Sequence, residues 1–424
     1  MGDRLPHARA LIAHIALHLQ ADCSVELWNR EVLPLGRDAR DDIRIVIASP
    51  AAIGRLVRSP RLTTLVEVYL AGGIDITGGS PLEALGRWEH LRAVHLKRHV
   101  DRALVLRHAL PFLRERTPED AGLGFAARVK RIAGRGRDDQ AMIQFHYDVS
   151  NAFYALFLGE EMQYSSAVFA DVDEDLDVAQ RRKLDLICTK LRLAPGKRLL
   201  DIGCGWGGLA AHAADHYGAT VHGVTLSAAQ LEAARARTER FGDRVTLELR
   251  DYRTLDAPES YDAIAQIGMF EHVGIDNHDT FFAQMARLLT PGGLYLHQAT
   301  TRRATRDLSK FRRQSAYMKV INRWIFPGGE LDYVGMTATN VERWGFEVRD
   351  VETMREHYHL TLKAWSERLY ARRDEASTEA GVTRTRLWLL YFALSCMGFW
   401  RGVLCDFQTL AQKKVTGLSG LPLR

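Results

Sequence analysis

Residues 198–208 read Arg198-Leu199-Leu200-Asp201-Ile202-Gly203-Cys204-Gly205-Trp206-Gly207-Gly208, and this stretch decides the fold. Its apolar first half follows the turn Pro195-Gly196 and predicts a short buried strand. The glycines predict a tight turn, because glycine adopts positive φ and lets the backbone approach a ligand closely. A helix is expected from Leu209, with its N-terminal N–H groups pointing into the same crevice. This order predicts a nucleotide-like ligand at the carboxyl end of a first parallel strand.

The segments after this turn repeat the alternation of strand and helix. Thr225 ends the second expected strand about twenty residues after the first, where a group that binds a ribose is expected. The alternation is typical of an α/β fold with a doubly wound sheet. The further strands are expected at 220–227, 245–249, 261–267, 294–297 and 346–351.

Asp201 stands at the end of the first strand, inside the pattern Asp-x-Gly-Cys-Gly-x-Gly. Its carboxylate would repel a pyrophosphate, whereas dinucleotide enzymes carry G-x-G-x-x-G and place a phosphate at the helix N-terminus. An acidic group here can instead bind the amine of a methionine. The pattern resembles the S-adenosylmethionine-dependent methyltransferases and implies their Rossmann-like, doubly wound sheet. The alternative is a glycine turn that serves packing alone.

Composition is that of an ordinary globular protein. With 424 residues the chain is long enough for two or three domains, and its net charge of +5 suggests only mild attraction to an anionic surface. The five cysteines have neither zinc nor disulfide spacing, so we expect no metal and a reducing cytoplasm. No segment resembles a signal peptide. The longest uncharged run, 387–400, is too short to span a bilayer and predicts a buried helix, with a membrane-contacting helix as the alternative.

Three regions follow one another along the chain. Residues 116–139 predict a linker, because their end is polar and glycine-rich. Residues 140–424 predict the catalytic domain. Residues 1–115 predict a small α+β domain without a catalytic pattern, whose expected elements are a strand at 43–47, helices at 50–57 and 62–70, and a short strand within 72–79.

Two segments of the catalytic region have unusual compositions. Residues 141–169 mix aromatic and polar groups, which predicts a lid over the crevice, with surface helices as the alternative. Residues 301–333 form an insertion with eight Lys/Arg and one acid, Asp307, between Arg302 and Arg323. This basic segment predicts contact with anionic lipid headgroups, and a solvated helix face is the alternative.

Several motifs together resemble bacterial cyclopropane-fatty-acyl-phospholipid synthases and their mycolic-acid-modifying relatives. They occur in order between residues 145 and 400. The turn at 205–208 and Gly268-Met269-Phe270-Glu271-His272-Val273 are the most specific of them. The others are Tyr147-Asp148-Val149-Ser150-Asn151, Met162-Gln163-Tyr164-Ser165, Gly223-Val224-Thr225-Leu226-Ser227, Ile325-Phe326-Pro327-Gly328-Gly329, and His357-Tyr358 with Thr361, Leu362 and Trp365.

The resemblance implies a lipid-binding-like N-terminal domain and a catalytic domain that acts on phospholipid acyl chains. It implies transfer of a methyl group from S-adenosylmethionine to a cis double bond. The residues implied for cofactor binding are Tyr164, Ser165, Asp201, Gly203, Gly205, Thr225, Ser227, Gln230 and Tyr252.

The resemblance also implies a bicarbonate ion, held by Glu271, His297 and Tyr358. The family usually has cysteine where this chain has Ser166, and a larger aliphatic residue where it has Ala299. Ser166 stays among the expected catalytic residues, because a hydroxyl hydrogen-bonds an oxyanion more strongly than a thiol does. A shifted ion would nevertheless select a different proton, which leaves the product open.

The site of proton loss after methyl transfer distinguishes the hypotheses. Loss from the new methyl group closes a cyclopropane, which is the main prediction. Loss from a neighbouring carbon gives a methylated or methylene acyl chain, which is the alternative. Trp206, Phe270 and Tyr154 are candidates to stabilise the cation that precedes this loss.

Two further hypotheses remain: an amine N-methyltransferase and a lipid-binding protein with a dead site. We expect phospholipid acyl chains as the partner, no nucleic acid, and a possible homodimer. The expected location is cytoplasmic, at the inner face of the membrane.

Overall fold

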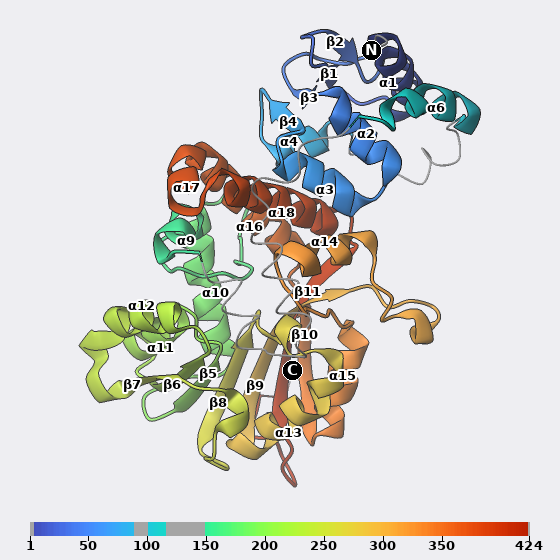
Figure 1. Cartoon of the computed structure of the whole chain (residues 1–424). Helices are drawn as coiled ribbons and strands as arrows, with labels where there is room; N and C mark the ends of the chain where they lie inside the picture. The colour runs from blue at the N-terminus through green and yellow to red at the C-terminus, as the bar shows by residue number, and fades with distance from the viewer. Residues whose placement is uncertain (1–3, 89–100, 116–148, 423–424) are drawn as a thin grey trace. The chain divides into compact units, whose positions relative to one another are not determined.

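The computed structural model describes residues 4–88, 101–115 and 149–422. These residues form two compact units (Figure 1). The first unit contains the described N-terminal part of the chain up to residue 115, together with residues 314–325 and 373–394. The second contains the other described residues. The linker predicted at 116–139 and the start of the predicted lid, 141–148, lie outside the described residues.

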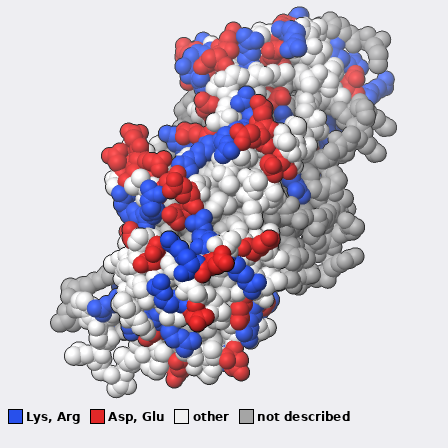
Figure 2. Space-filling model, turned by 90° about the vertical axis from the view of Figure 1, so that its left-hand side faces the viewer, with Lys and Arg blue, Asp and Glu red and all other residues white. Residues whose placement is uncertain are grey.

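Charged side chains of both signs share the surface. On the face shown in Figure 2, Lys and Arg side chains lie among Asp and Glu side chains. On this face the two signs of charge are interspersed among the described residues.

A four-stranded sheet of order β2-β1-β3-β4 forms the centre of the first unit. Strand β1 pairs antiparallel with β2 and parallel with β3, and β4 is antiparallel to β3. Helix α2 begins with a proline at its first turn, which suits a position without an N–H partner. The elements are α1 (Leu5–Leu19), β1 (Ser24–Glu26), β2 (Val32–Pro34), β3 (Arg44–Ile47), α2 (Pro50–Arg58), α3 (Leu62–Leu70), β4 (Ile74–Thr77), α4 (Pro81–Gly86) and α6 (Arg102–Ala109).

The predicted elements of this unit are confirmed, but the sequence did not predict β1 and β2. Three residues are too few to show an alternating pattern. The unit's apolar core gathers around Cys23, Val25 and Phe112, which are all buried.

Segments from far along the chain complete the first unit. Helix α14 (Ala316–Trp324) packs against α3, and its Arg323 forms an ion pair with Glu67 at 2.7 Å. Helix α17 (Arg373–Ala380) and the first part of α18 (Val382–Trp400) also belong to it. Our prediction gave all of 140–424 to one domain, whereas the structure assigns 314–325 and 373–394 to this unit.

A seven-stranded sheet of order β10-β11-β9-β8-β5-β6-β7 forms the centre of the second unit. Strands β5, β6, β7, β8 and β9 run parallel, whereas β11 is antiparallel to both β9 and β10. This sheet confirms the predicted α/β fold with a doubly wound sheet. Its strands are β5 (Arg198–Ile202), β6 (Thr220–Thr225), β7 (Val245–Leu249), β8 (Tyr261–Ile267), β9 (Leu289–Arg302), β10 (Phe346–Thr353) and β11 (Leu404–Lys413).

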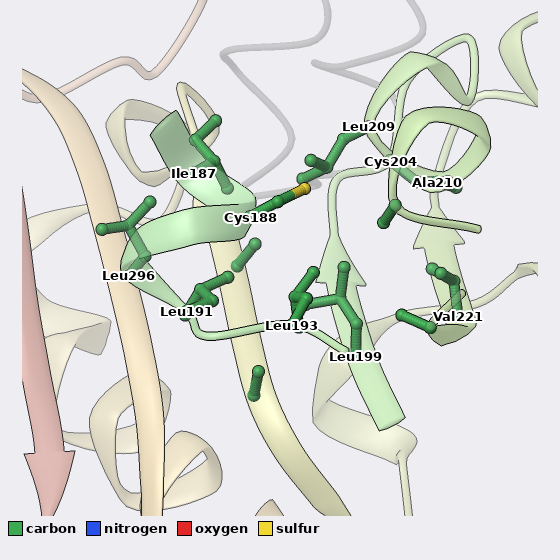
Figure 3. Close-up of a cluster of buried hydrophobic side chains, with 14 of the residues drawn as sticks. Ile187, Cys188, Leu191, Leu193, Leu199, Cys204, Leu209, Ala210, Val221 and Leu296 are labelled. Carbon is green, nitrogen blue, oxygen red and sulfur yellow. The ribbon is translucent and has the colours of Figure 1, made fainter. Parts of the chain in front are cut away.

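Helices cover both faces of this sheet with separate apolar cores. Side chains from α10 meet those from α11 over β5 and β6, as Figure 3 shows for Cys188, Leu209 and Val221. On the other face, α13 contributes Phe281 and Phe282 to the second core. The helices of the unit are α9 (Asn151–Leu158), α10 (Leu176–Lys190), α11 (Gly208–His216), α12 (Ala228–Thr238), α13 (His278–Leu288), α15 (Val334–Arg343) and α16 (Arg355–Ala371).

The uncharged run at 387–400 lies in helix α18, as predicted. Leu387, Trp388 and Phe392 are buried, whereas Trp400 at its end is exposed. Across the described ranges of the chain, no helix combines the length and apolar character needed to cross a bilayer. The five cysteines are free thiols, which agrees with the absence of a disulfide spacing in the sequence.

Candidate active site

A pocket lies at the carboxyl ends of β5, β6 and β8, the position predicted from the glycine turn. Its empty volume is about 1120 Å³ with the open mouth included, which is ample for a nucleoside-sized ligand. The residues predicted to bind the cofactor line it with one exception, Ser227. Those in the lining are Tyr164, Ser165, Asp201, Gly203, Gly205, Thr225, Gln230 and Tyr252.

The glycine turn brings bare backbone to the pocket. Gly203 and Gly205 have φ values of +81° and +53°, which residues with a Cβ rarely adopt. A Cβ on Gly208, the first residue of α11, would lie 2.2 Å from Gln163 Nε2 and 2.5 Å from Glu161 O. The glycines therefore shape the turn and also let residues 161–163 pack directly on the start of the helix.

Asp201 is buried at the end of β5, where it lines the pocket. The residue is 3% exposed, and its Oδ2 is enclosed without a hydrogen-bond partner. Burial raises the pKa of Asp201 to about 7, and the positive charge of Lys183 opposes this rise. An unpaired acceptor beside a pocket suits an ammonium group, because a buried carboxylate is costly unless it is paired.

Residues that follow β6 form the part of the pocket where a ribose was expected. Thr225 Oγ1 donates a hydrogen bond to Gln230 Oε1 at 3.3 Å and accepts one from Ser227 N at 3.2 Å. Ser227 itself caps helix α12, since its hydroxyl accepts from Gln230 N at 3.4 Å. The structure thus gives Ser227 a place behind the pocket wall, where it orients Gln230 instead of lining the pocket.

Aromatic rings support the wall formed by residues 162–165. The ring of Tyr164 stacks on Trp365 of α16, with centroids 5.3 Å apart. Tyr154 contacts Tyr164 at 5.7 Å and Trp206 at 4.9 Å. Trp206 Nε1 donates to Asn151 Oδ1 at 2.8 Å, which fixes α9 beside the glycine turn. The described part of the predicted lid therefore contributes a packed wall of the pocket.

Another part of the pocket lining follows β7 and includes charged residues that the motifs did not single out. Tyr252 is buried and packs its ring against Phe281 at 5.2 Å. Asp251 accepts hydrogen bonds from Arg253, whose guanidinium lies 5.9 Å from the Tyr252 ring. Hydrogen bonds from Arg253 lower the pKa of Asp251 despite the opposing effect of burial. The sequence indicated Asp251 and Arg253 only by their position after a third parallel strand.

Glu271 follows β8 and is held by the backbone of β9. Its Oε1 accepts a hydrogen bond from Thr300 N at 2.7 Å, whereas its Oε2 is buried without a partner. Burial raises the pKa of Glu271, although the hydrogen bond from Thr300 opposes the shift. The site thus favours a protonated Glu271 more than water does.

His297 lies in β9 and is 1% exposed. Its Nδ1 shares a hydrogen bond of 2.8 Å with Tyr295 Oη, and its Nε2 is buried without a partner. Burial lowers the pKa of His297 to about 3, with a further contribution from His278. The imidazole is therefore neutral at physiological pH. Phe270 contacts it, with ring centroids 4.6 Å apart.

Ser166 lies in the segment before α10, and Tyr358 lies in α16. The Ser166 hydroxyl is fully buried and donates to Ala167 O at 3.0 Å, while Ala167 N donates to Thr361 Oγ1 at 3.0 Å. Tyr358 lies one turn before Thr361 and packs on Phe399, with centroids 4.6 Å apart. Glu271 binds the backbone of β9, the strand that carries His297, and the neighbour of Ser166 binds Thr361 of α16, the helix that carries Tyr358. None of these four predicted catalytic residues is among those that line the cofactor pocket.

Glu271 Oε2 and His297 Nε2 are each buried without a hydrogen-bond partner, so each could accept a further partner such as a small oxyanion. Glu271 can donate a hydrogen bond from Oε2 only in its protonated form, which burial favours. A Tyr295 hydroxyl that donates to Nδ1 leaves the imidazole proton on Nε2, so that atom is a donor as well. The donor set therefore suits bicarbonate, and the ion itself stays a prediction.

Fold and pocket together define a class of protein. The sheet has five parallel strands and an antiparallel β10-β11 edge, and its glycine turn lies beside Asp201 at the end of β5. These features are typical of an S-adenosylmethionine-dependent methyltransferase.

Comparisons with known proteins identify the family within this class. The family profile described as mycolic acid cyclopropane synthetase matches residues 135–409, so the chain belongs to that family. A probable fatty acid methyltransferase of Pseudomonas putida is 34% identical over 94% of this chain and 93% of its own length. The cyclopropane-fatty-acyl-phospholipid synthase of Escherichia coli K12 is 40% identical over 60% of this chain and 63% of its own. The structure of mycolic acid cyclopropane synthase CmaA1, complexed with SAH and CTAB, is 32% identical with a TM-score of 0.61, over 65% of this chain and 99% of that one.

Proposed function

We propose that this chain methylates the cis double bond of a lipid acyl chain and that its product is a methylated or methylene-branched acyl chain. The relative similar over nearly the whole length is named a probable fatty acid methyltransferase. The relative named for cyclopropane synthesis is similar over 60% of the chain. Cyclopropane formation, our main prediction from sequence, therefore becomes the second candidate.

The cofactor pocket can orient the methyl donor. When bound, S-adenosylmethionine supplies an electrophilic sulfonium methyl group. Asp201 would bind its ammonium group, and Thr225 and Gln230, which line the pocket after β6, would bind the ribose hydroxyls. Trp206 lines the pocket and Tyr154 packs against it, so we expect these buried rings to exclude water and to stabilise developing positive charge.

The hydrogen bond of Ser166 is the observation that carries the choice of product. Its single hydroxyl proton is donated to Ala167 O at 3.0 Å, so it is not available to an oxyanion at the same time. Glu271 and His297, with Tyr358, would hold bicarbonate, which would supply a base. An ion with one donor fewer is held less firmly beside the new methyl group. This favours loss of a proton from a neighbouring carbon of the acyl chain.

We also propose that the basic insertion brings the enzyme to anionic lipid. Lys310, Arg312 and Arg323 are paired with acidic residues. Arg303, Arg306 and Arg313 form no ion pair with the described residues. Each free cation near an anionic bilayer contributes roughly 1 kcal/mol of attraction. Three such residues support peripheral binding at a membrane surface.

The product can be read directly from lipids. Cells that contain unsaturated phospholipids would express the chain and receive methyl-labelled methionine, and their acyl chains would be examined by mass spectrometry and NMR. Vinylic methyl or exocyclic methylene signals are expected, in chains heavier by one CH₂ group. Upfield cyclopropane protons would favour the second candidate. The Escherichia coli relative, expressed in parallel, is the positive control. If its cells contain labelled lipid and cells that express this chain do not, the proposal that this chain acts on lipid acyl chains is contradicted.

A further inference from the structure

Lys183 is a buried charge that the motifs of the pocket do not include. It lies on α10 in line with Ala179 and Ile187, four residues away on either side, and all three are fully buried. This line of positions faces the interior of the protein, where an apolar residue is expected. A lysine there needs partners, because an isolated buried charge costs several kcal/mol.

The partners of Lys183 all belong to the wall or floor of the cofactor pocket. Its Nζ donates hydrogen bonds to Gln163 Oε1 at 2.6 Å and to Ser165 Oγ at 3.1 Å. Helix α10 makes a second hydrogen bond to Ser165, because Gln180 Nε2 donates to Ser165 O at 3.1 Å. Asp201, whose Oδ2 is enclosed and unpaired, attracts the lysine electrostatically.

From this arrangement we infer that Lys183 is a positioning residue for the cofactor: it keeps the Asp201 carboxylate ionised and fixes Gln163 and Ser165 in the pocket wall. Asp201 can attract an ammonium group only while it carries a negative charge. Lys183 supplies the opposite charge from behind the pocket, where it does not occupy the place of the ligand. The inference concerns cofactor binding and holds for any methyl acceptor.

The charged groups around the pair are few. Lys183 is attracted by Asp201, Glu161 and Asp406, and burial lowers its pKa to about 7. Glu161 is itself paired with Arg237 at 3.4 Å, and Asp406 accepts a hydrogen bond from Gln298 at 2.7 Å. The Cys188 and Cys204 thiols lie near Asp201, and burial raises the pKa of both, so they add no charge at neutral pH.

The sign of the expected effect follows from these groups. Lys183 opposes the rise that burial causes in the pKa of Asp201. Without the lysine this pKa rises further above 7, so Asp201 is protonated at pH 7 and does not attract the ammonium group. Raising the pH restores the carboxylate. The loss of affinity is therefore large at neutral pH and small at alkaline pH.

Calorimetry with S-adenosylhomocysteine between pH 6 and pH 8.5 tests this inference on the full chain. Lys183→Met is expected to bind about tenfold more weakly at pH 6, about fivefold more weakly at pH 7 and within about twofold of the wild type at pH 8.5, as expected if the pKa of Asp201 rises from about 7 to about 8. Lys190→Met is the matched control. Lys190 lies two turns further along α10 and pairs with Glu352 of β10, so affinity should stay unchanged at every pH.

Lys183→Gln serves if the methionine variant does not fold, because an amide keeps a donor for Ser165 and lacks the charge. The same pH-dependent loss is expected from it. A loss of equal size at all pH values would show that Lys183 acts only through its hydrogen bonds to Gln163 and Ser165, and would overturn its role in keeping Asp201 ionised. Unchanged affinity at every pH would overturn both roles. Because binding is measured without lipid, this test can fail or succeed independently of the lipid analysis.

Discussion

The guanidinium of Arg386 lies 4.2 Å from the ring centroid of Tyr69, although 317 positions separate the two residues in the sequence. The same guanidinium donates to Tyr69 O at 2.6 Å, to Ile74 O at 2.9 Å and to Asp75 Oδ1 at 2.8 Å. One side chain from α18 thus binds the end of α3 and the start of β4. The N-terminal unit depends on this late part of the chain for its own stability.

Replacement of Arg386 by methionine should destabilise the chain by about 2–4 kcal/mol, because three acceptors lose a charged donor and a cation–π contact disappears. Denaturant unfolding of the full chain, followed by fluorescence, measures this loss. Arg107→Met on α6 is the control, since Arg107 is exposed and should change stability by less than about 0.5 kcal/mol. Equal stability of the two variants would remove Arg386 as a link within this unit.

Asp201→Asn should weaken S-adenosylhomocysteine binding between ten- and a hundredfold at pH 8, a loss of about 1.4–2.8 kcal/mol. The amide keeps the size of the side chain but removes the charge that attracts an ammonium group. Calorimetry gives the affinity. Asp262→Asn is the control, because Asp262 binds Arg198 N and Lys197 at the opposite end of the strands. Unchanged affinity in Asp201→Asn would place the ammonium group elsewhere.

Gly208→Ala should reduce cofactor affinity by at least about tenfold without unfolding the chain. The added methyl group would lie 2.2 Å from Gln163 Nε2 and 2.5 Å from the Glu161 carbonyl, so residues 161–163 must move away from α11. Gly86→Ala adds the same group in open space and should leave affinity as it is. If both variants bind alike, the pocket tolerates movement of this wall.

Glu271→Gln should leave cofactor affinity intact and lower turnover by about a hundredfold or more. Glutamine keeps an acceptor for Thr300 N and a donor in place of a protonated Oε2, but it cannot release a proton. Binding by calorimetry and initial rates with labelled cofactor separate the two effects. Glu347→Gln, on the exposed side of β10, is the control. Turnover near the wild-type rate would remove Glu271 from the ion site.

Stability offers a second measurement on the same residue. Burial raises the folded-state pKa of Glu271 above that of the unfolded chain, so its contribution favours folding at acidic pH and is lost as the pH rises through the folded value. The glutamine variant should therefore lose less stability than the wild type when the pH is raised above about 4.3. If the stability of the wild type and of Glu271→Gln changes with pH in the same way, burial does not raise the pKa of Glu271 in the folded protein.

Ser166→Cys should move the product mixture toward cyclopropane. A thiol is a weak donor, so it would bind the Ala167 carbonyl less firmly than the hydroxyl does and could turn toward an ion beside Glu271. NMR of the lipid products gives the ratio. Ser166→Ala, which has no donor, should keep the branched product. An identical ratio in all three proteins would show that residue 166 does not direct proton loss.

The sequence predicted the elements whose apolar runs are continuous and bounded by turns. Strands β5 to β8 are of this kind, and their glycine turn carries its own conformational signature. Strand β11 is different, because Asp406, Gln408 and Gln412 are buried within it. These polar side chains bind partners in β9 and the loops, so the hydrogen bonds that make their burial tolerable exist only in the folded sheet.

The site residues also differ in how far the sequence could predict them. Asp201, Thr225 and Glu271 follow predicted strands, so their place at one edge of the sheet could be derived from order alone. Lys183 is one polar residue on a helix, and its role depends on Asp201 and Ser165 being brought to it by the fold. Its position midway between Ala179 and Ile187 was the available signal, since it interrupts a buried stripe.

The interleaving of the two units also bears on how such a protein can change in evolution. Residues 314–325 and 373–394 complete the N-terminal unit from inside the catalytic part of the chain. A gene fusion that joined residues 1–115 to another enzyme would carry Tyr69 and Glu67 without Arg386 and Arg323. We therefore expect residues 1–115 alone to be less stable than the complete unit. Shuffling by recombination at the apparent domain boundary would leave both products incomplete.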